Sequence, residues 1–280
     1  MKTKRIILLL ILISQVVFSQ EKEVKKESNK GKLFFYWGWN VADYSNSDIH
    51  FKGENYDFTL YDVSAKDRPT PFGFDPYFHP LKITIPQTNV RIGYFFHDNY
   101  TISVGVDHMK YVMNQYQKVK INGTINTGSS YDNVYTNNDE VLLTHDFLQF
   151  EHTDGLNYVN AELKRFDEIG HLIGMTSKDF TLSITEGVGA GILFPRTNTK
   201  LLGGERHDDF HVSGWGVSVG AGLNLTFLKY FFIQSDLKWG YINMQDIKTS
   251  LNSVDSASQK FTFFEKTIVF GARFNILNKK

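Results

Sequence analysis

The chain of 280 residues contains no cysteine, which excludes several kinds of protein at once. Without a thiol it cannot be a diacylated lipoprotein or a disulfide scaffold, and it offers no thiol nucleophile or thiolate metal ligand. It also lacks any apolar run near the roughly 20 residues that a membrane helix needs. Basic residues do not exceed acidic ones, at 30 each, which argues against nucleic acid as a partner.

The first residues have the pattern of a secretory signal. Three basic residues precede an apolar run over residues 6–13, and residues 17–19 (VFS) make a small-residue cleavage site before Gln20. We therefore predict a signal peptide over residues 1–19, a flexible periplasmic leader over residues 20–32 and one large β domain over residues 33–280.

The chain is rich in glycine and aromatic residues, and residues 211–227 show how they are used. From Trp215 to Phe227 every second residue is apolar, and the residues between are Gly, Ser, Asn and Thr. Successive side chains of a strand point to opposite faces, so one face is apolar and the other is small and polar. Glycines on the polar face suggest that side chains from across a narrow lumen need the room. The pattern predicts a membrane-spanning β-strand.

Similar alternation recurs along the chain and predicts an antiparallel, up-and-down transmembrane β-barrel of eight strands. The expected strands are residues 33–42, 83–96, 100–112, 156–166, 180–193, 211–227, 231–241 and 264–276. A count of ten to twelve stays open, because residues 48–63 and 141–152 also alternate.

Short and long connections alternate between the predicted strands, as spanning barrels require. The short connections are residues 97–99, 167–178 and 228–229, and the long ones are residues 43–82, 113–154, 194–210 and 244–259. We expect the long loops outside the cell and both termini in the periplasm. The two longest loops are expected to extend the neighbouring strands as hairpins.

These features together resemble the OmpA/OmpX-type eight-stranded outer-membrane barrels of Gram-negative bacteria. The resemblance rests on the signal, on the glycine-rich segment 214–222 (GWGVSVGAG) and on the aromatic segment 268–276 (IVFGARFNI). Such barrels often finish on an aromatic residue, whereas Phe274 is followed here by six more residues. The resemblance implies an outer-membrane protein, a monomer in contact with outer-membrane lipid and lipopolysaccharide, without a cofactor.

Charged residues occupy the lumen-facing positions of the predicted strands. Because eight strands enclose a space that side chains roughly fill, we expect these charges to pair as a plug. A gated path for small ions is the alternative. The predicted network comprises Arg91, Asp107, Glu162, Lys164, Asp236, Lys238, Glu265 and Arg273.

One alternative function is a lipid acyl hydrolase, because some barrels of this class are lipid A deacylases that use a His-x-Ser pair. His211 and Ser213 have that spacing and the same outward parity, which suits a base and its nucleophile. Glu186, the outward acid on the preceding strand, is expected to lie too far away. Acids of the adjoining loop, Glu205, Asp208 or Asp209, are the other candidates for the orienting group.

A second group of polar residues lies in the outer part of the second long loop. It comprises His145, Asp146, Glu151, His152 and Asp154, and could present a divalent metal or an acid–base pair. Alternation divides the group between two faces, so a solvated hairpin is the competing interpretation. Oxygen-rich residues 132–140 could hold Ca²⁺ only weakly.

The leading functional hypothesis is that the long loops bind a ligand or a surface, in adhesion or envelope contact. They are rich in aromatic residues, and Pro69, Pro71, Pro76 and Pro80 stiffen the first loop. Packing between the hairpins is the simpler explanation, and a soluble secreted ligand-binding barrel is the rival fold. The aromatic loop residues are Phe72, Phe74, Tyr77, Phe78, Tyr131 and Tyr135.

Overall fold

The computed structural model describes residues 28–79, 81–82, 85–175, 177 and 179–275. Nearly all of its regular structure is antiparallel β. The long strands are β1 (Lys32–Tyr44), β5 (Thr88–His97), β6 (Tyr100–Met113), β9 (Leu148–Glu168), β10 (Phe180–Leu193), β12 (Gly214–Phe227), β13 (Phe231–Lys248) and β14 (Ser256–Asn275). The shorter elements are β2 (Ser47–Lys52), β3 (Tyr56–Val63), β4 (Ala65–Lys66), the helical turn α2 (Phe74–Tyr77), β7 (Lys118–Ile125), β8 (Asn133–Leu142), the 3₁₀ turn η1 (Gly170–Ile173) and β11 (Asn198–Leu201).

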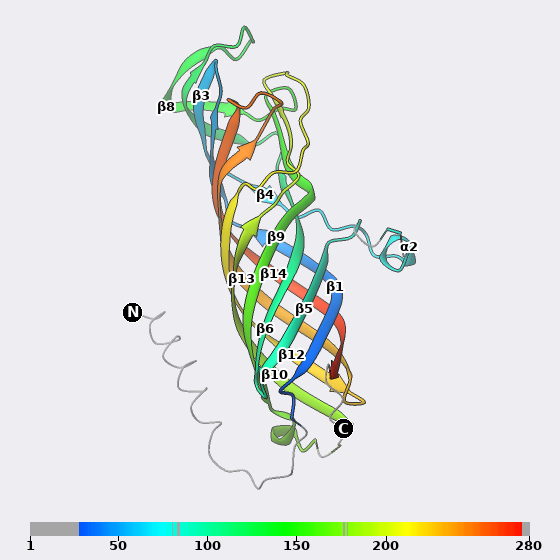
Figure 1. The fold of residues 1–280 in the computed structure, drawn as a ribbon. Helices are drawn as coiled ribbons and strands as arrows, with labels where there is room; N and C mark the ends of the chain where they lie inside the picture. Colours follow the sequence, from blue (N-terminus) through cyan, green and yellow to red (C-terminus); the bar gives the residue numbers. More distant parts are fainter. Residues whose placement is uncertain (1–27, 80, 83–84, 176, 178, 276–280) are drawn as a thin grey trace, which may run out of the picture.

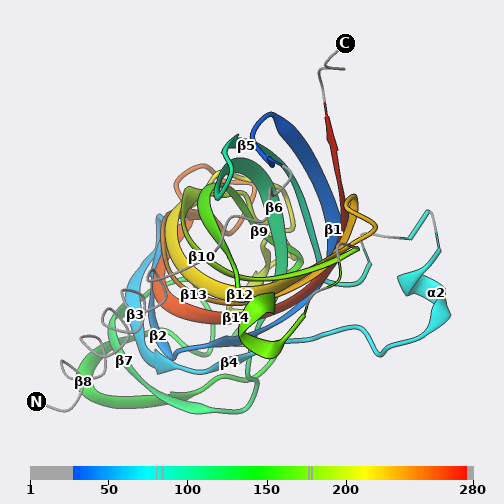
Figure 2. The same cartoon turned by 90° about the horizontal axis from the view of Figure 1, so that it is seen from below.

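The eight long strands form a closed ring. Each pairs with the next in the order β1-β5-β6-β9-β10-β12-β13-β14, and β14 pairs back with β1 from Lys32↔Asn275 to Tyr44↔Phe263. Figure 2 shows this ring from below, along the barrel. The predicted eight-stranded, up-and-down barrel is confirmed. Of the extra alternating segments, residues 48–63 form β2 and β3 outside the ring, and residues 148–152 only lengthen the ring strand β9.

Apolar side chains cover the outside of the ring, as expected where lipid replaces water. The soluble rival, with the apolar faces inside, is contradicted over the ring because the charges point inward. Within the described part of the chain, no helix is long and apolar enough to cross a membrane. The outward belt includes Phe35, Val90, Ile92, Tyr94, Ile102, Val104, Val159, Leu163, Ile184, Val188, Ile192, Val217, Val219, Leu223, Leu237, Trp239, Ile268 and Phe270.

Glycines on the inward face leave room for aromatic rings. A Cβ on Gly93 would collide with the ring of Phe34, and one on Gly271 would collide with the ring of Phe232. Each ring lies over the glycine that pairs with it on the adjacent strand, so the inward glycines make room for large side chains in a narrow barrel.

The two ends of the barrel differ, and we call them the turn end and the loop end. At the turn end, Ser28 and Asn29 bond to Asp98 in the turn between β5 and β6. The predicted signal peptide and the leader up to residue 27 lie outside the described residues. At the loop end, the sheet continues beyond the ring as a curved extension (Figure 1).

The extension grows from the upper part of β14. There Ser256–Gln259 pairs with β2 instead of β1, and β3, β7 and β8 follow in order. On other strands, β4 pairs with β6 and β11 pairs with β9. The connection predicted over residues 244–259 is mostly strand, because β13 and β14 extend beyond the expected membrane level as a hairpin.

Candidate functional site

A network of buried ion pairs fills the middle of the barrel, and Lys238 of β13 is its centre. The Lys238 Nζ lies 2.6 Å from Asp107 Oδ2, 3.5 Å from Glu162 Oε1 and 3.6 Å from Glu265 Oε2. These acids come from β6, β9 and β14, so one ammonium group joins strands on opposite sides of the ring.

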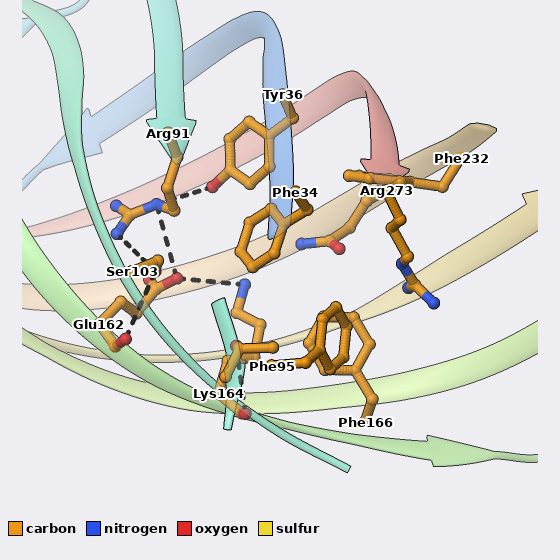
Figure 3. A pocket seen from close by; sticks show the side chains of 12 residues that line it. Phe34, Tyr36, Arg91, Phe95, Ser103, Glu162, Lys164, Phe166, Phe232 and Arg273 are labelled. Atoms are coloured by element: carbon orange, nitrogen blue, oxygen red, sulfur yellow. Dashed lines mark hydrogen bonds and ion pairs between the residues drawn. The ribbon is translucent and has the colours of Figure 1, made fainter. Parts of the chain in front are cut away.

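Two more cations complete the network. Lys164 pairs with Asp236 at 3.0 Å and with Glu162 at 3.4 Å. The Arg91 guanidinium lies 3.5 Å from Asp107 and 3.7 Å from Glu162, and it donates hydrogen bonds to Tyr36 and Asn160. Figure 3 shows the side of the network that includes Arg91, Glu162 and Lys164. Seven of the eight predicted lumen residues therefore meet in one cluster.

Arg273, the eighth lumen residue, does not form the ion pair that the sequence predicts. Among the described residues it has no carboxylate partner, and its guanidinium lies 5.0–5.4 Å from the ring centres of Phe95, Phe166 and Phe232. Its Nη2 donates to Asn224 Oδ1 at 2.9 Å. The prediction of an ion pair is corrected, since cation–π contacts take its place.

Aromatic rings surround Arg273 at the turn end of the lumen, and Figure 3 draws them together with the neighbouring ion pairs. Phe34, Tyr36, Phe95, Phe166 and Phe232 form one buried cluster there. The cavity between this cluster and the ion pairs offers only about 10 Å³ to the centre of a water molecule, room for roughly one water. An aqueous path does not run through this part of the barrel.

Above the ion pairs the interior becomes apolar. Along β6 the inward side chains change from Asp107 to Met109, Tyr111 and Met113, which are all buried. They belong to a large apolar core that continues into the extension and packs Phe51 of β2 against other aromatic rings. The loop end is thus filled like the core of a water-soluble domain.

The predicted catalytic pair is not assembled. The sixth strand begins at Gly214 and not at His211, so strand parity does not reach His211 and Ser213. Ser213 is buried, and its hydroxyl lies 3.4 Å from the backbone oxygen of His211 and is not bonded to the imidazole. The His211 ring instead meets Asp246 at 2.8 Å, an acid that the sequence did not indicate.

The second predicted cluster is dispersed. His152 is buried, and Nδ1 of its ring bonds to Thr197 at 2.9 Å, whereas His145 is exposed beside Tyr116. Burial lowers the pKa of His152 to about 3.

The three acids of this cluster face other partners or solvent. Glu151 pairs with Arg68, Asp154 pairs with Arg196, and Asp146 is exposed. Within the part of the chain that the structure describes, no group of three or more His, Asp or Glu side chains is placed to hold a metal. The predicted metal or acid–base site is therefore corrected, because strand parity and separate ion pairs pull its members apart.

The aromatic loop residues fall into two groups. Tyr131 packs its ring on Phe147 at 5.0 Å, and the Tyr135 hydroxyl donates to the Tyr131 carbonyl, so both stabilise the extension. Phe72, Phe74 and Phe78 lie on the segment around α2, which projects sideways from the barrel wall (Figure 1).

A cleft opens at the loop end, and sequence reasoning did not find it. It has a volume of about 630 Å³ and lies between Tyr56 of β3 and residues 127–129, 201–207 and 249–255. Burial and the nearby Asp255 raise the pKa of Tyr56 to about 12. The lining comes from segments far apart in the sequence, and only the extension brings them together.

A closed ring of eight strands, with an apolar belt outside and paired charges inside, defines an integral outer-membrane β-barrel protein. The chain matches no protein-family model and no curated protein.

Many solved structures are similar to it, among them three of outer-membrane proteins. The outer membrane protein OprG from Pseudomonas aeruginosa has a TM-score of 0.42 and 11% identity, over 89% of this chain and 98% of that one. The outer membrane protein AlkL in DMPC lipid bilayers has a TM-score of 0.44 and 12% identity, over 94% of this chain and 99% of that one. The N-terminal β-barrel domain of Pseudomonas aeruginosa OprF has a TM-score of 0.29 and 8% identity, over 88% of this chain and 98% of that one. The likeness is one of fold only.

Proposed function

We propose that this outer-membrane barrel binds a ligand outside the cell through the cleft at its loop end. In this proposal the loop end faces the exterior, both termini are periplasmic, and the barrel is a monomeric anchor in outer-membrane lipid and lipopolysaccharide. The observation that carries it is a contrast. The lumen is filled by ion pairs and apolar side chains, whereas the cleft is open.

The size and lining of the cleft favour a small ligand or the end of a polymer. Its volume of about 630 Å³ lies within the ~300–1,000 Å³ that is typical of small-ligand sites. The walls combine hydroxyl and amide groups with charged Glu205 and Arg206 and with apolar Leu202 and Leu251. Such a mixture suits a ligand with both polar groups and an apolar face.

The Arg206 side chain is held in place at the rim of this cleft. Its Nε donates to Asn198 at 2.7 Å and its Nη2 lies 3.1 Å from Asp208, while more than half of the side chain stays exposed. A guanidinium fixed in this way is pre-organised to bind a carboxylate or phosphate group of a ligand.

The test is a binding screen with the purified full-length barrel in lipid nanodiscs, on arrays of glycans and of short peptides. Any ligand of the parent should lose at least about tenfold in affinity with Tyr56→Ala and with Arg206→Ala, about 1.4 kcal/mol. The matched control is Val134→Ala, an exposed apolar residue of β8 that does not line the cleft. Ligand binding that survives both cleft substitutions would contradict the proposal.

A further inference from the structure

The segment around α2 exposes an unusual concentration of large apolar side chains. Phe74 is 85% exposed and Leu81 is 90% exposed, and Phe72 and Phe78 are also mostly in the open. Adjoining apolar side chains of this size rarely remain in water without a partner.

The same segment rests on the outer wall of the barrel. Trp39 of β1 faces outward, and its ring lies 5.4 Å from the rings of Tyr77 and Phe78 and 6.0 Å from that of Phe270. Phe270 is an exposed member of the apolar belt. The α2 segment therefore continues the surface that faces lipid.

The depth of this contact corresponds to a membrane interface. Trp39 is paired with Ile268 of the belt, and the exposed ion pair between Lys266 and Asp43 lies further toward the loop end on the same two strands. Tryptophan rings concentrate where hydrocarbon meets the headgroups. In Figure 1 the segment projects sideways at this level and does not rise with the extension.

The backbone and charges of the segment suit such a position. Phe78 and His79 donate their N–H groups to Phe74 and Pro76, and Lys82 donates to His79. The ammonium of Lys82 is neutralised by Asp75 at 2.8 Å. Paired groups lower the cost of approaching the hydrocarbon.

We propose that Phe72, Phe74, Phe78 and Leu81 form a lipid anchor that inserts among the acyl chains of the leaflet at the loop end of the barrel. The anchor holds the segment around α2 flat on the membrane beside β1 and β5. The aromatic side chains around α2 thus contact lipid, whereas the ligand cleft is lined by Tyr56 of β3 and by segments outside the α2 region.

The absence of cysteine permits a direct test, because one introduced thiol is the only site of labelling. Phe74→Cys is labelled with the fluorophore NBD and reconstituted in phosphatidylcholine vesicles that contain a lipid with a nitroxide near the headgroup. The control is Val134→Cys, which is 70% exposed on β8 of the extension. Heat-resistant mobility on a gel shows that each variant is folded.

The anchor predicts that nitroxide lipid quenches the label at position 74 at least about twofold more than the label at position 134. Aqueous iodide should show the opposite preference. Quenching of position 74 by iodide and not by lipid would overturn the proposal. Equal lipid quenching at both positions would also overturn it, because the label itself would then be partitioning. Protection from both quenchers would overturn it as well, because it would mean that a second copy covers the segment.

Discussion

Lys238 shows how a single residue can organise the interior of a small barrel. A buried ammonium is costly unless it is paired and hydrogen-bonded. Here Asp107, Glu162 and Glu265 lie within 3.6 Å of its Nζ, and each comes from a different strand. The cost of burial is thus offset by contacts that form only when the ring is closed in one register.

Substitution of Lys238 by Met should therefore destabilise the protein strongly. The substitution removes the ammonium that neutralises the buried carboxylates of Asp107, Glu162 and Glu265. Breaking such a buried network typically lowers the free energy of unfolding by about 3–5 kcal/mol. The measurement is the free energy of unfolding by guanidinium in detergent micelles. Lys118→Met removes an exposed pair with Glu140 and should cost only about 0–1 kcal/mol. Equal losses in the two variants would refute the role of the network.

Sequence parity was sufficient to place Lys238 and its acids in the lumen, because one face of each ring strand must be polar. It could not predict the environment of Arg273. The rings of Phe95, Phe166 and Phe232 belong to three strands, and their meeting around one guanidinium depends on the stagger of the closed barrel. Strand patterns alone do not specify that stagger.

At the scale of elements, the inward face of the strands changes from charged to apolar where the strands leave the membrane. On β6 the inward face is charged at Asp107 and apolar from Met109 to Met113, because water replaces lipid outside the wall at that level. The ring was predicted from alternation, which persists through both regions. The sequence did not predict that the apolar face turns inward at the loop end. Alternation of apolar and polar residues along a strand does not show which of the two faces points into the barrel.

The ends of strands were predicted least well. Alternation predicts that the sixth strand starts at residue 211, but pairing begins at Gly214. The backbone carbonyl of Ser213 instead accepts hydrogen bonds from the N–H groups of Gln245 and Asp246, which hold the residue inside the loop end. A spacing motif at a strand end therefore gave no reliable geometry for the proposed catalytic pair.

The loop end of the barrel should be less stable in acid because of His152 on β9. Burial lowers its pKa from 6.5 to about 3, so the unfolded chain binds a proton that the folded chain excludes as pH falls below 6.5. Between pH 6 and pH 4 this should cost about 2–3 kcal/mol of unfolding free energy.

The comparison of His152→Gln with the parent isolates this contribution. The variant should lose less stability than the parent over the same pH range, measured by guanidinium unfolding at each pH. His145→Gln, which removes an exposed histidine just before β9, is the control and should behave like the parent. Identical pH dependence in the parent and in His152→Gln would show that the buried imidazole has no such effect.

At the scale of the whole molecule, three layers stack along one axis. Aromatic rings and Arg273 close the turn end, ion pairs fill the middle, and an apolar core fills the loop end below an open cleft. Each layer blocks the lumen by a different interaction. This arrangement supports the proposal that the protein acts through its loop end and does not conduct through its centre.

Electrical recording from the purified full-length protein in planar lipid bilayers tests this account most directly. We predict no steady openings at moderate voltage, since the remaining cavity beside the ion pairs holds roughly one water. Lys238→Met, recorded in parallel, shows whether loss of the central cation opens a path. Stable, well-resolved conductance steps from the parent protein would contradict the sealed interior on which the proposed function depends.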